Sequence, residues 1–461
     1  MSDTNNTTIS STSPTNFETT LTEGPIWKRM VSFAIPLFFG NLFQQLYNAA
    51  DSLIVGNFLG KQALAAVSST SSLIFLLVGF FNGIAIGAGV VIAHYYGAKE
   101  TESLRKAVHT TVAFGIICGL ALMVIGLVMV PSLLRLMRTP SDVLPNSILY
   151  FRIYFLGSLA FVLYNNFVGI LQSVGDSKHP LYYLIFSSLL NIVLDLILIG
   201  VFHFGVGAAA LATIISQFAS ALMCLYRLLF KCPKEYRLTF KELRLDPCML
   251  RQVIKNGLPS GMQNSIISIA NVFVQSNINA FGSVAVAGCG SYSRIDGFAF
   301  LPVICFSMAL TTFISQNLGA KKYDRVKKGG RFGILCGIIL AELVGLTIYF
   351  TIPVLIACFN RDPEIIAYGV KQAHILTPFF FLCAFSHCMA GLLRGAGKST
   401  VPMYIMMVVW CFIRVAYISI IVRFIPTIDV VFWGYPLTWF LSSIAFLYYY
   451  LKTDWVHGYP H

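Results

Sequence analysis

About a dozen apolar segments, each long enough to cross a lipid bilayer, limit what this chain can fold into. They lie near residues 31–58, 64–93, 107–134, 147–174, 181–202, 206–230, 256–281, 284–318, 332–358, 365–393, 401–424 and 430–451. Inside a membrane the backbone must satisfy its own hydrogen bonds, and runs of this length do so as helices, because barrel strands need only about 10 residues. The sequence therefore predicts an all-α polytopic membrane protein with twelve transmembrane helices.

Composition and the placement of charge exclude the soluble alternatives. Of the 461 residues, 57% are hydrophobic and 11% are charged, whereas a soluble domain carries roughly 25% charged residues. The net charge of +13 would suggest a nucleic-acid partner in a soluble protein. Here, with the N-terminus in the cytoplasm, 23 Lys and Arg fall on the cytoplasmic side and five fall outside. The positive-inside rule accounts for this bias, so we expect a multi-pass protein of the cell (inner or plasma) membrane, with both termini cytoplasmic and no nucleic-acid partner.

An internal repeat relates the two halves of the chain. Pro36 in the first segment is matched by Pro259 in the seventh, and Gly97-Ala98-Lys99 is matched by Gly319-Ala320-Lys321 at almost the same offset in numbering. Six helices separate the copies, and because this number is even, both halves cross the membrane in the same direction. The repeat predicts two parallel six-helix lobes related by a pseudo-two-fold axis along the membrane normal.

These observations divide the chain into five parts. We expect a disordered polar tail at 1–25, an N-lobe at 26–230, a basic cytoplasmic linker at 231–252, a C-lobe at 253–452 and a C-terminal tail at 453–461.

Acidic residues inside the predicted spans are the strongest indication of a functional site, because a charge within the membrane is costly. Only four of the 19 acidic residues fall there: Asp51, Asp195, Asp296 and Glu342. Asp51 shares a helix face with Tyr47, four residues earlier, and Asp195 is four residues from Asn191. Each of these two helices therefore carries a polar stripe that ends in a carboxylate.

The chemistry of the two stripes leaves several interpretations open. Two carboxylates, an amide and hydroxyls on facing helices form an oxygen-rich site that suits a hard cation such as Na⁺. Alternatively the carboxylates share a proton, since like charges close together disfavour double ionisation. The structural alternative is that each aspartate completes a hydrogen-bond network or extends to a membrane surface.

Local motifs extend these patterns over nearly the whole chain after residue 25. They include Ala50-Asp51-Ser52-Leu53-Ile54-Val55-Gly56 in the first segment, the two Gly-Ala-Lys motifs, and Asn191-Ile192-Val193-Leu194-Asp195 in the fifth. On these residues the chain resembles the multidrug and toxic compound extrusion (MATE) transporter family, in its bacterial multidrug-pump-like branch. The resemblance implies a cation-coupled antiporter, driven by H⁺ or Na⁺, with a V-shaped pair of lobes.

The resemblance also implies roles for individual residues. It implies an N-lobe site for the coupling proton or a possible Na⁺ formed by Asp51, Asn191, Asp195 and Thr213, with a less specific surrounding network of Tyr47, Tyr150 and Asn165. Pro36 resembles the first-helix proline whose bending the family couples to ion binding, and an interior proline does permit a kink. The alternative for Pro36 is a static kink.

Departures from the family pattern concern the C-lobe. The seventh and tenth predicted segments contain no acidic residue, which argues against the C-lobe cation site of some branches. Arg294 and Asp296 in the eighth segment resemble the multidrug-pump branch, but residues two apart do not face each other on a helix. Gln172 stands where many relatives have an arginine, whereas its second-half counterpart Arg394 keeps one.

Together these observations predict a secondary antiporter that exports amphipathic organic, often cationic, compounds by rocker-switch alternating access. The principal alternative is a flippase for lipid-linked saccharides of the same superfamily, and a non-transporting membrane protein is the third class. No catalytic pair or metal-ligand spacing is visible, so we expect no enzyme activity and no cofactor. The expected partners are small amphipathic substrates and the lipid bilayer, and the expected state is a monomer.

Overall fold

The computed structural model describes residues 21–136 and 144–457, and within them every regular element is helical. The first half contains α1 (Ile26–Leu59), α2 (Lys61–Ala98), α3 (Thr101–Leu136), α4 (Leu144–Leu156), α5 (Ser158–Ser173), α6 (Lys178–Asp195) and α7 (Gly207–Tyr226). The second half contains α8 (Pro247–Asn279), α9 (Ser283–Ala299), α10 (Leu301–Gly319), α11 (Tyr323–Ala357), α12 (Pro363–Leu376), α13 (Phe380–Gly395), α14 (Thr400–Met406), α15 (Arg414–Phe424) and α16 (Ile428–Lys452). Short π-helical stretches extend α6 to Val201 and α7 to Lys231, and another joins α14 to α15.

These helices follow the predicted order of twelve segments. Several segments consist of two helices in succession, and α4 and α5 meet at a bend of 48°. Nine helices in the described part of the chain are long and apolar enough to span a bilayer, or ten if α4 and α5 form one span. The two full-length helices outside this set, α1 and α8, are the first helix of each lobe, and both contain an interior proline.

The backbone carries the repeat that the sequence predicted. Lys99, which follows α2, and Lys321, which follows α10, both adopt the left-handed conformation, with φ of 58° and 57°. Gly175 and Gly397, which are separated by the same offset as these two lysines, also have positive φ. Equivalent turns therefore end equivalent helices in the two lobes, and the two-lobe layout is confirmed.

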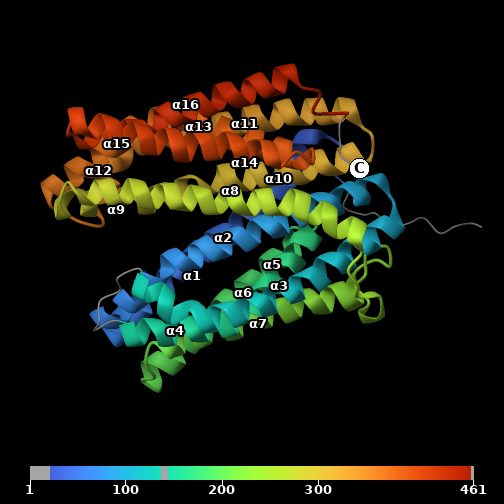
Figure 1. Cartoon of the computed structure of the whole chain (residues 1–461), viewed down its shortest axis with the longest axis horizontal. Helices are drawn as coiled ribbons and strands as arrows, with labels where there is room; N and C mark the ends of the chain where they lie inside the picture. Colours follow the sequence, from blue (N-terminus) through green and yellow to red (C-terminus); the bar gives the residue numbers. More distant parts are fainter. Residues whose placement is uncertain (1–20, 137–143, 458–461) are drawn as a thin grey trace, which may run out of the picture.

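The lobes touch at one end of the molecule and diverge at the other, which gives the V shape seen in Figure 1. Along the contact, α2 packs closely against α8. A Cβ on Gly83 would lie 2.4 Å from the backbone of Gly261, and one on Gly87 would lie 2.2 Å from Gly257. Only glycines allow the two helices to approach so closely. The open end of the V is the end away from the C-terminus and the linker (Figure 1).

Helix α10 of the C-lobe closes the same end from the other side. The Ser315 hydroxyl donates a 2.6 Å hydrogen bond to the carbonyl of Val90 in α2, and the Gln316 amide donates one of 2.6 Å to the carbonyl of Ser173 at the end of α5. All of these groups are buried or nearly so. Opening the molecule at this end would break these contacts.

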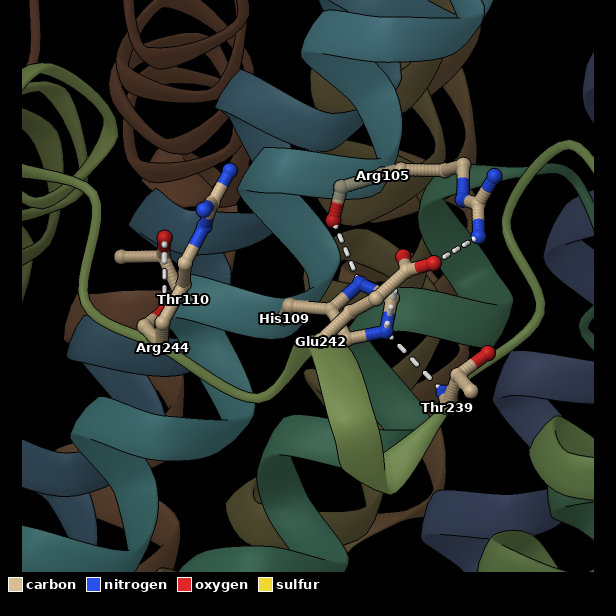
Figure 2. Close-up of polar contacts among 6 residues, drawn as sticks. All are labelled: Arg105, His109, Thr110, Thr239, Glu242 and Arg244. Carbon is tan, nitrogen blue, oxygen red and sulfur yellow. Dashed lines mark hydrogen bonds and ion pairs between the residues drawn. The ribbon is translucent and has the colours of Figure 1, made fainter.

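The linker between the lobes folds back onto α3 of the N-lobe, as Figure 2 shows. His109 is buried, and its Nδ1 lies 2.7 Å from the Arg105 carbonyl while its Nε2 lies 3.0 Å from the amide nitrogen of Thr239. A carbonyl only accepts and an amide N–H only donates, so these contacts define a neutral ring protonated on Nδ1. An ion pair of 2.5 Å between Arg105 and Glu242 fixes the linker beside it.

The described residues differ from three predicted boundaries. Leu21 and Thr22, inside the predicted tail 1–25, are buried against the C-lobe, where the Leu21 amide donates to Gln316 Oε1 at 2.9 Å. Helix α8 already begins at Pro247, within the predicted linker 231–252, because Asp246 caps it by accepting from the Met249 amide. In the predicted C-terminal tail, Trp455 is buried in the C-lobe core. Residues 1–20 and 458–461 of the predicted tails lie outside the described residues.

Candidate functional site

Two carboxylates meet inside the N-lobe. Helices α1 and α6 pack side by side, and the carboxyl groups of Asp51 and Asp195 lie close enough to interact electrostatically. Asp195 is 0% exposed, and Asp51 is partly buried. Two ionised carboxyl groups this close together and away from water repel each other, so a proton or another cation at the pair would lower its energy.

Asn191 and Thr213 lie on the same side of the N-lobe and are both buried. The Asn191 amide Nδ2 is 3.5 Å from the Thr213 hydroxyl, which itself donates to the Ala209 carbonyl at 3.0 Å. The remaining oxygen of this amide, Asn191 Oδ1, has no hydrogen-bond partner in the described residues. The same holds for Asp51 Oδ1 and for both Asp195 oxygens. The site therefore presents several buried oxygens that no protein donor satisfies.

The structure separates the three residues of the predicted surrounding network. Tyr47 and Tyr150 lie close enough to both carboxyl groups to interact with them electrostatically. Asn165 instead donates to the Phe161 carbonyl at 2.8 Å and lines a cavity between the lobes.

The Arg294 and Asp296 pair of the eighth segment does not form an ion pair. Arg294 is exposed, whereas Asp296 accepts a 3.3 Å hydrogen bond from the Tyr292 hydroxyl. This agrees with the prediction that the side chains of residues two apart point away from each other.

The C-lobe contains a buried cation to which the sequence analysis gave no role. Arg414 at the start of α15 is 1% exposed and donates to the Thr438 hydroxyl from Nε at 3.1 Å and from Nη2 at 2.7 Å. Its guanidinium lies 4.4 Å from the ring centroid of Tyr435. The presence of an arginine within an apolar segment could have indicated this site. Its partners Thr438 and Tyr435 lie on another helix, so the sequence alone did not identify them.

A cavity of about 170 Å³ lies between α1, α2, α5, α6, α7, α10 and α13. Pro36 lines it, and α1 continues as one helix through this residue. Carboxamides contribute much of the polar lining: Asn41, Gln44, Asn82, Asn165, Gln172 and Gln217. The charged side chain among the lining residues is Arg394 at the end of α13. Asp51 and Asp195 do not line this cavity, so the carboxylate pair and the cavity are separate sites.

Two lobes of parallel topology, a polar cavity at their junction and a buried carboxylate pair define a polytopic membrane transport protein. The MatE family model matches residues 36–197 and 259–420, one copy in each lobe. The chain therefore belongs to the MATE family.

Individual relatives agree with this assignment. The chain is 30% identical to the probable multidrug resistance protein YoeA of Bacillus subtilis, over 93% of this chain and 94% of that protein. It is 23% identical to the FAD transporter of Shewanella oneidensis, over 75% of this chain and 77% of that one. A crystal structure of MATE in complex with MaL6 superposes with a TM-score of 0.87 at 24% identity, over 96% of this chain and 98% of that chain. The last of these similarities concerns the fold.

Proposed function

We propose that this protein is a secondary active antiporter, which exports amphipathic organic compounds in exchange for H⁺ or Na⁺ by rocker-switch alternating access. The observation that carries the proposal is the proximity of Asp51 and Asp195, whose buried oxygens include three without a hydrogen-bond partner among the described residues. Relatives such as YoeA are named as probable multidrug resistance proteins. Another relative is named as an FAD transporter. The chemical class of the transported compound must therefore be inferred from the lining of this chain's own cavity.

In the proposed mechanism the N-lobe carboxylates couple ion binding to lobe movement. When Asp51 and Asp195 are both ionised, they repel each other within a medium of low dielectric. A shared proton, or Na⁺ bound together with the Asn191 and Thr213 oxygens, removes this repulsion. Binding of the ion therefore changes the free-energy difference between the two lobe arrangements. Any ligand-driven transition requires such a change.

Pro36 connects the proposed ion site to the cavity through helix α1. It lies in the same helix as Asp51, fifteen residues earlier, and lines the cavity. The proline removes one helical hydrogen bond, so α1 can bend there at a low cost. We propose that loading of the aspartate pair changes this bend and hence the shape of the cavity.

A gradient experiment tests the function. Purified protein in proteoliposomes should drive uphill movement of an amphipathic dye when a proton or sodium gradient is imposed, and collapse of that gradient with an ionophore should stop it. Dye movement that follows only its own concentration gradient, under both ions, would contradict antiport.

The proposed orientation has native reporters at the two ends of the molecule. We propose that the protein is a monomer in the cell membrane with its linker and both termini in the cytoplasm. Cys248 at the linker end and Cys358 at the opposite end are both exposed. A membrane-impermeant maleimide should label Cys358 in intact cells and Cys248 only after permeabilisation, with Cys248→Ser and Cys358→Ser as the matched controls. Labelling of Cys248 in intact cells would reverse the topology.

A further inference from the structure

The cavity between the lobes has an unusual charge balance for a site expected to take organic cations. Its lining contains amides, hydroxyls, aliphatic and aromatic side chains and one guanidinium, but no aspartate or glutamate among the described residues. Amides supply both donors and acceptors without net charge. The cavity therefore carries a single formal charge, and that charge is positive.

Arg394 is buried at this cavity without a counter-charge. Its side chain is 8% exposed, and its Nε is buried with no hydrogen-bond partner among the described residues. No acidic group in the described part of the chain lies within ion-pair distance of it: the acidic partners of the ion pairs there are Glu102, Asp176, Glu242, Asp429 and Asp454, each joined to another cation. A buried charge that no protein group compensates is costly to keep.

Comparison of the two repeats shows that the buried arginine lies on only one side of the cavity. Gln172 occupies the position in the N-lobe that is equivalent to Arg394, at the offset that relates the two lobes, and it lines the same cavity. The pair therefore places a neutral amide on the N-lobe wall and a guanidinium on the C-lobe wall. A guanidinium binds carboxylate or phosphate oxygens through two parallel hydrogen bonds, whereas it repels an organic cation.

We propose that the cavity selects amphipathic compounds that carry an anionic group, a carboxylate or a phosphate-type ester, and that Arg394 binds this group. The surrounding amides hydrogen-bond the polar part of the compound, while Phe33, Leu37 and Phe161 contact its apolar part. This inference deepens the proposed export function and rests on it for its physiological meaning. The binding itself does not depend on the coupling ion.

Two dyes with the same tricyclic frame test the charge preference. Anionic fluorescein and cationic rhodamine are titrated separately into the purified full-length protein in detergent, and binding is followed by fluorescence anisotropy. Wild-type protein should bind fluorescein more tightly than rhodamine. Rising salt should weaken fluorescein binding, because salt screens the attraction between the guanidinium and the dye.

Variants at position 394 identify the binding group. Arg394→Gln, which copies the N-lobe counterpart, should weaken fluorescein binding by about tenfold or more, the value of a charge-assisted hydrogen bond. Arg394→Lys keeps the charge but not the paired geometry, so it should retain part of the affinity. Rhodamine binding should be unchanged or stronger in Arg394→Gln. Arg423→Gln, at an exposed arginine of α15, is the matched control and should leave both affinities unchanged.

The outcomes separate this inference from the proposed function. Tighter binding of rhodamine than of fluorescein to the wild-type protein would overturn the anion preference, and so would the failure of both dyes to bind. These comparisons use wild-type protein, so they decide the question even if Arg394→Gln does not fold. Equal fluorescein affinity in a folded Arg394→Gln protein would show that another group binds the anion. Failure of gradient-driven transport in proteoliposomes would instead contradict the antiport proposal and leave the binding result standing.

Discussion

Equivalent pairs of helices carry opposite kinds of polar group in the two lobes. In the N-lobe, Asn191 on α6 contacts Thr213 on α7, and nearby carboxylate oxygens have no protein donor among the described residues. In the C-lobe, Arg414 occupies the equivalent segment, at the position that the repeat pairs with Ile192, and donates twice to Thr438 on α16. The N-lobe presents buried acceptors without a protein donor among the described residues, whereas the C-lobe contains a cation as part of the chain.

The surroundings of Arg414 hold its guanidinium in one position. Its guanidinium lies over the rings of Tyr435 and Trp410, at 4.4 and 5.5 Å from their centroids. Tyr435 stands at the position equivalent to Thr213 of the N-lobe. Cation–π contacts and hydrogen bonds to a fixed guanidinium stabilise one arrangement. We therefore propose that ion-driven switching belongs to the N-lobe and that the C-lobe acts as a fixed body against which it moves.

The largest effect expected from this comparison concerns the N-lobe carboxylates. Asp195→Asn and Asp51→Asn should each abolish gradient-driven efflux, because the amide imitates the neutral, loaded state and removes the repulsion of the empty state. Fold and dye binding should remain largely intact. The measurement is efflux from proteoliposomes, together with dye binding by variants of matched thermal stability.

Asp296→Asn is the control for this prediction. Asp296 accepts from Tyr292 within the C-lobe, so its replacement should affect transport less. If both N-lobe asparagine variants still drive uphill efflux, the coupling site lies elsewhere, and Asp296 and Glu342 become the leading candidates.

The second effect tests the fixed cation of the C-lobe. Arg414→Met should lower stability by about 2 kcal/mol, since it removes hydrogen bonds and cation–π contacts at a buried position. The ion-to-substrate ratio of the remaining folded protein should not change. Thermal unfolding in detergent measures the first quantity and a flux ratio the second.

Arg423→Met, on the exposed surface of the same helix α15, is the matched control and should leave the melting temperature nearly unchanged. An Arg414→Met protein of wild-type stability whose coupling ratio had changed would place ion exchange in the C-lobe.

The sequence predicted the architecture because hydrophobic length and charge bias are local properties. The twelve segments, the parallel repeat and the family followed from residues that lie close together in the chain or at one offset. The structure brings Asp51, Asn191, Asp195 and Thr213 to one side of the N-lobe, although their functional role stays a prediction. The bounds of the predicted tail 1–25 and linker 231–252 differ from the structure at Leu21 and Pro247, where specific backbone hydrogen bonds order the chain and start helix α8.

Other features of the site depend on which helix faces meet. The lack of a partner for the Arg394 Nε among the described residues and the contact of Arg414 with Thr438 arise from packing between helices far apart in sequence. Helical periodicity gives the face on which a side chain lies, but not the face opposite it. The expectation of often cationic cargo came from the resemblance to the family, which does not determine the charge of this chain's own cavity lining.

A smaller effect concerns the connection between the ion site and the cavity. Pro36→Ala should keep expression near normal but slow transport severalfold, because the added helical hydrogen bond resists bending of α1. Dye affinity at equilibrium should change less than the transport rate. Pro259→Ala, the repeat-related change in α8, is the matched control. Equal slowing of transport by both variants would remove the distinction between a switching lobe and a fixed lobe. Unchanged transport kinetics in Pro36→Ala would show that Pro36 is a static feature of α1.

The smallest effect is expected at a carboxylate that is exposed and fully partnered. Asp454 accepts from the amides of Val456 and His457 at 3.2 and 3.1 Å, and the His457 ring lies 2.8 Å from its other oxygen. The backbone N–H of His457, followed by its side chain, lowers the pKa of Asp454 below its ordinary value of 3.8. A lowered pKa contributes stability at pH values above the ordinary pKa, and this stability is lost as the pH falls through the lowered pKa.

Asp454→Asn should therefore slightly loosen the turn that holds Trp455 at neutral pH and should make no difference in strong acid. Limited proteolysis of the C-terminus at the two pH values measures this effect. Gradient-driven efflux should be unaffected, since the donors to Asp454 are supplied by the chain itself, whereas the Asp195 oxygens have no such donors in the described residues. Loss of efflux in Asp454→Asn would mean that removing any carboxylate impairs this transporter, and the N-lobe variants would no longer identify a coupling site.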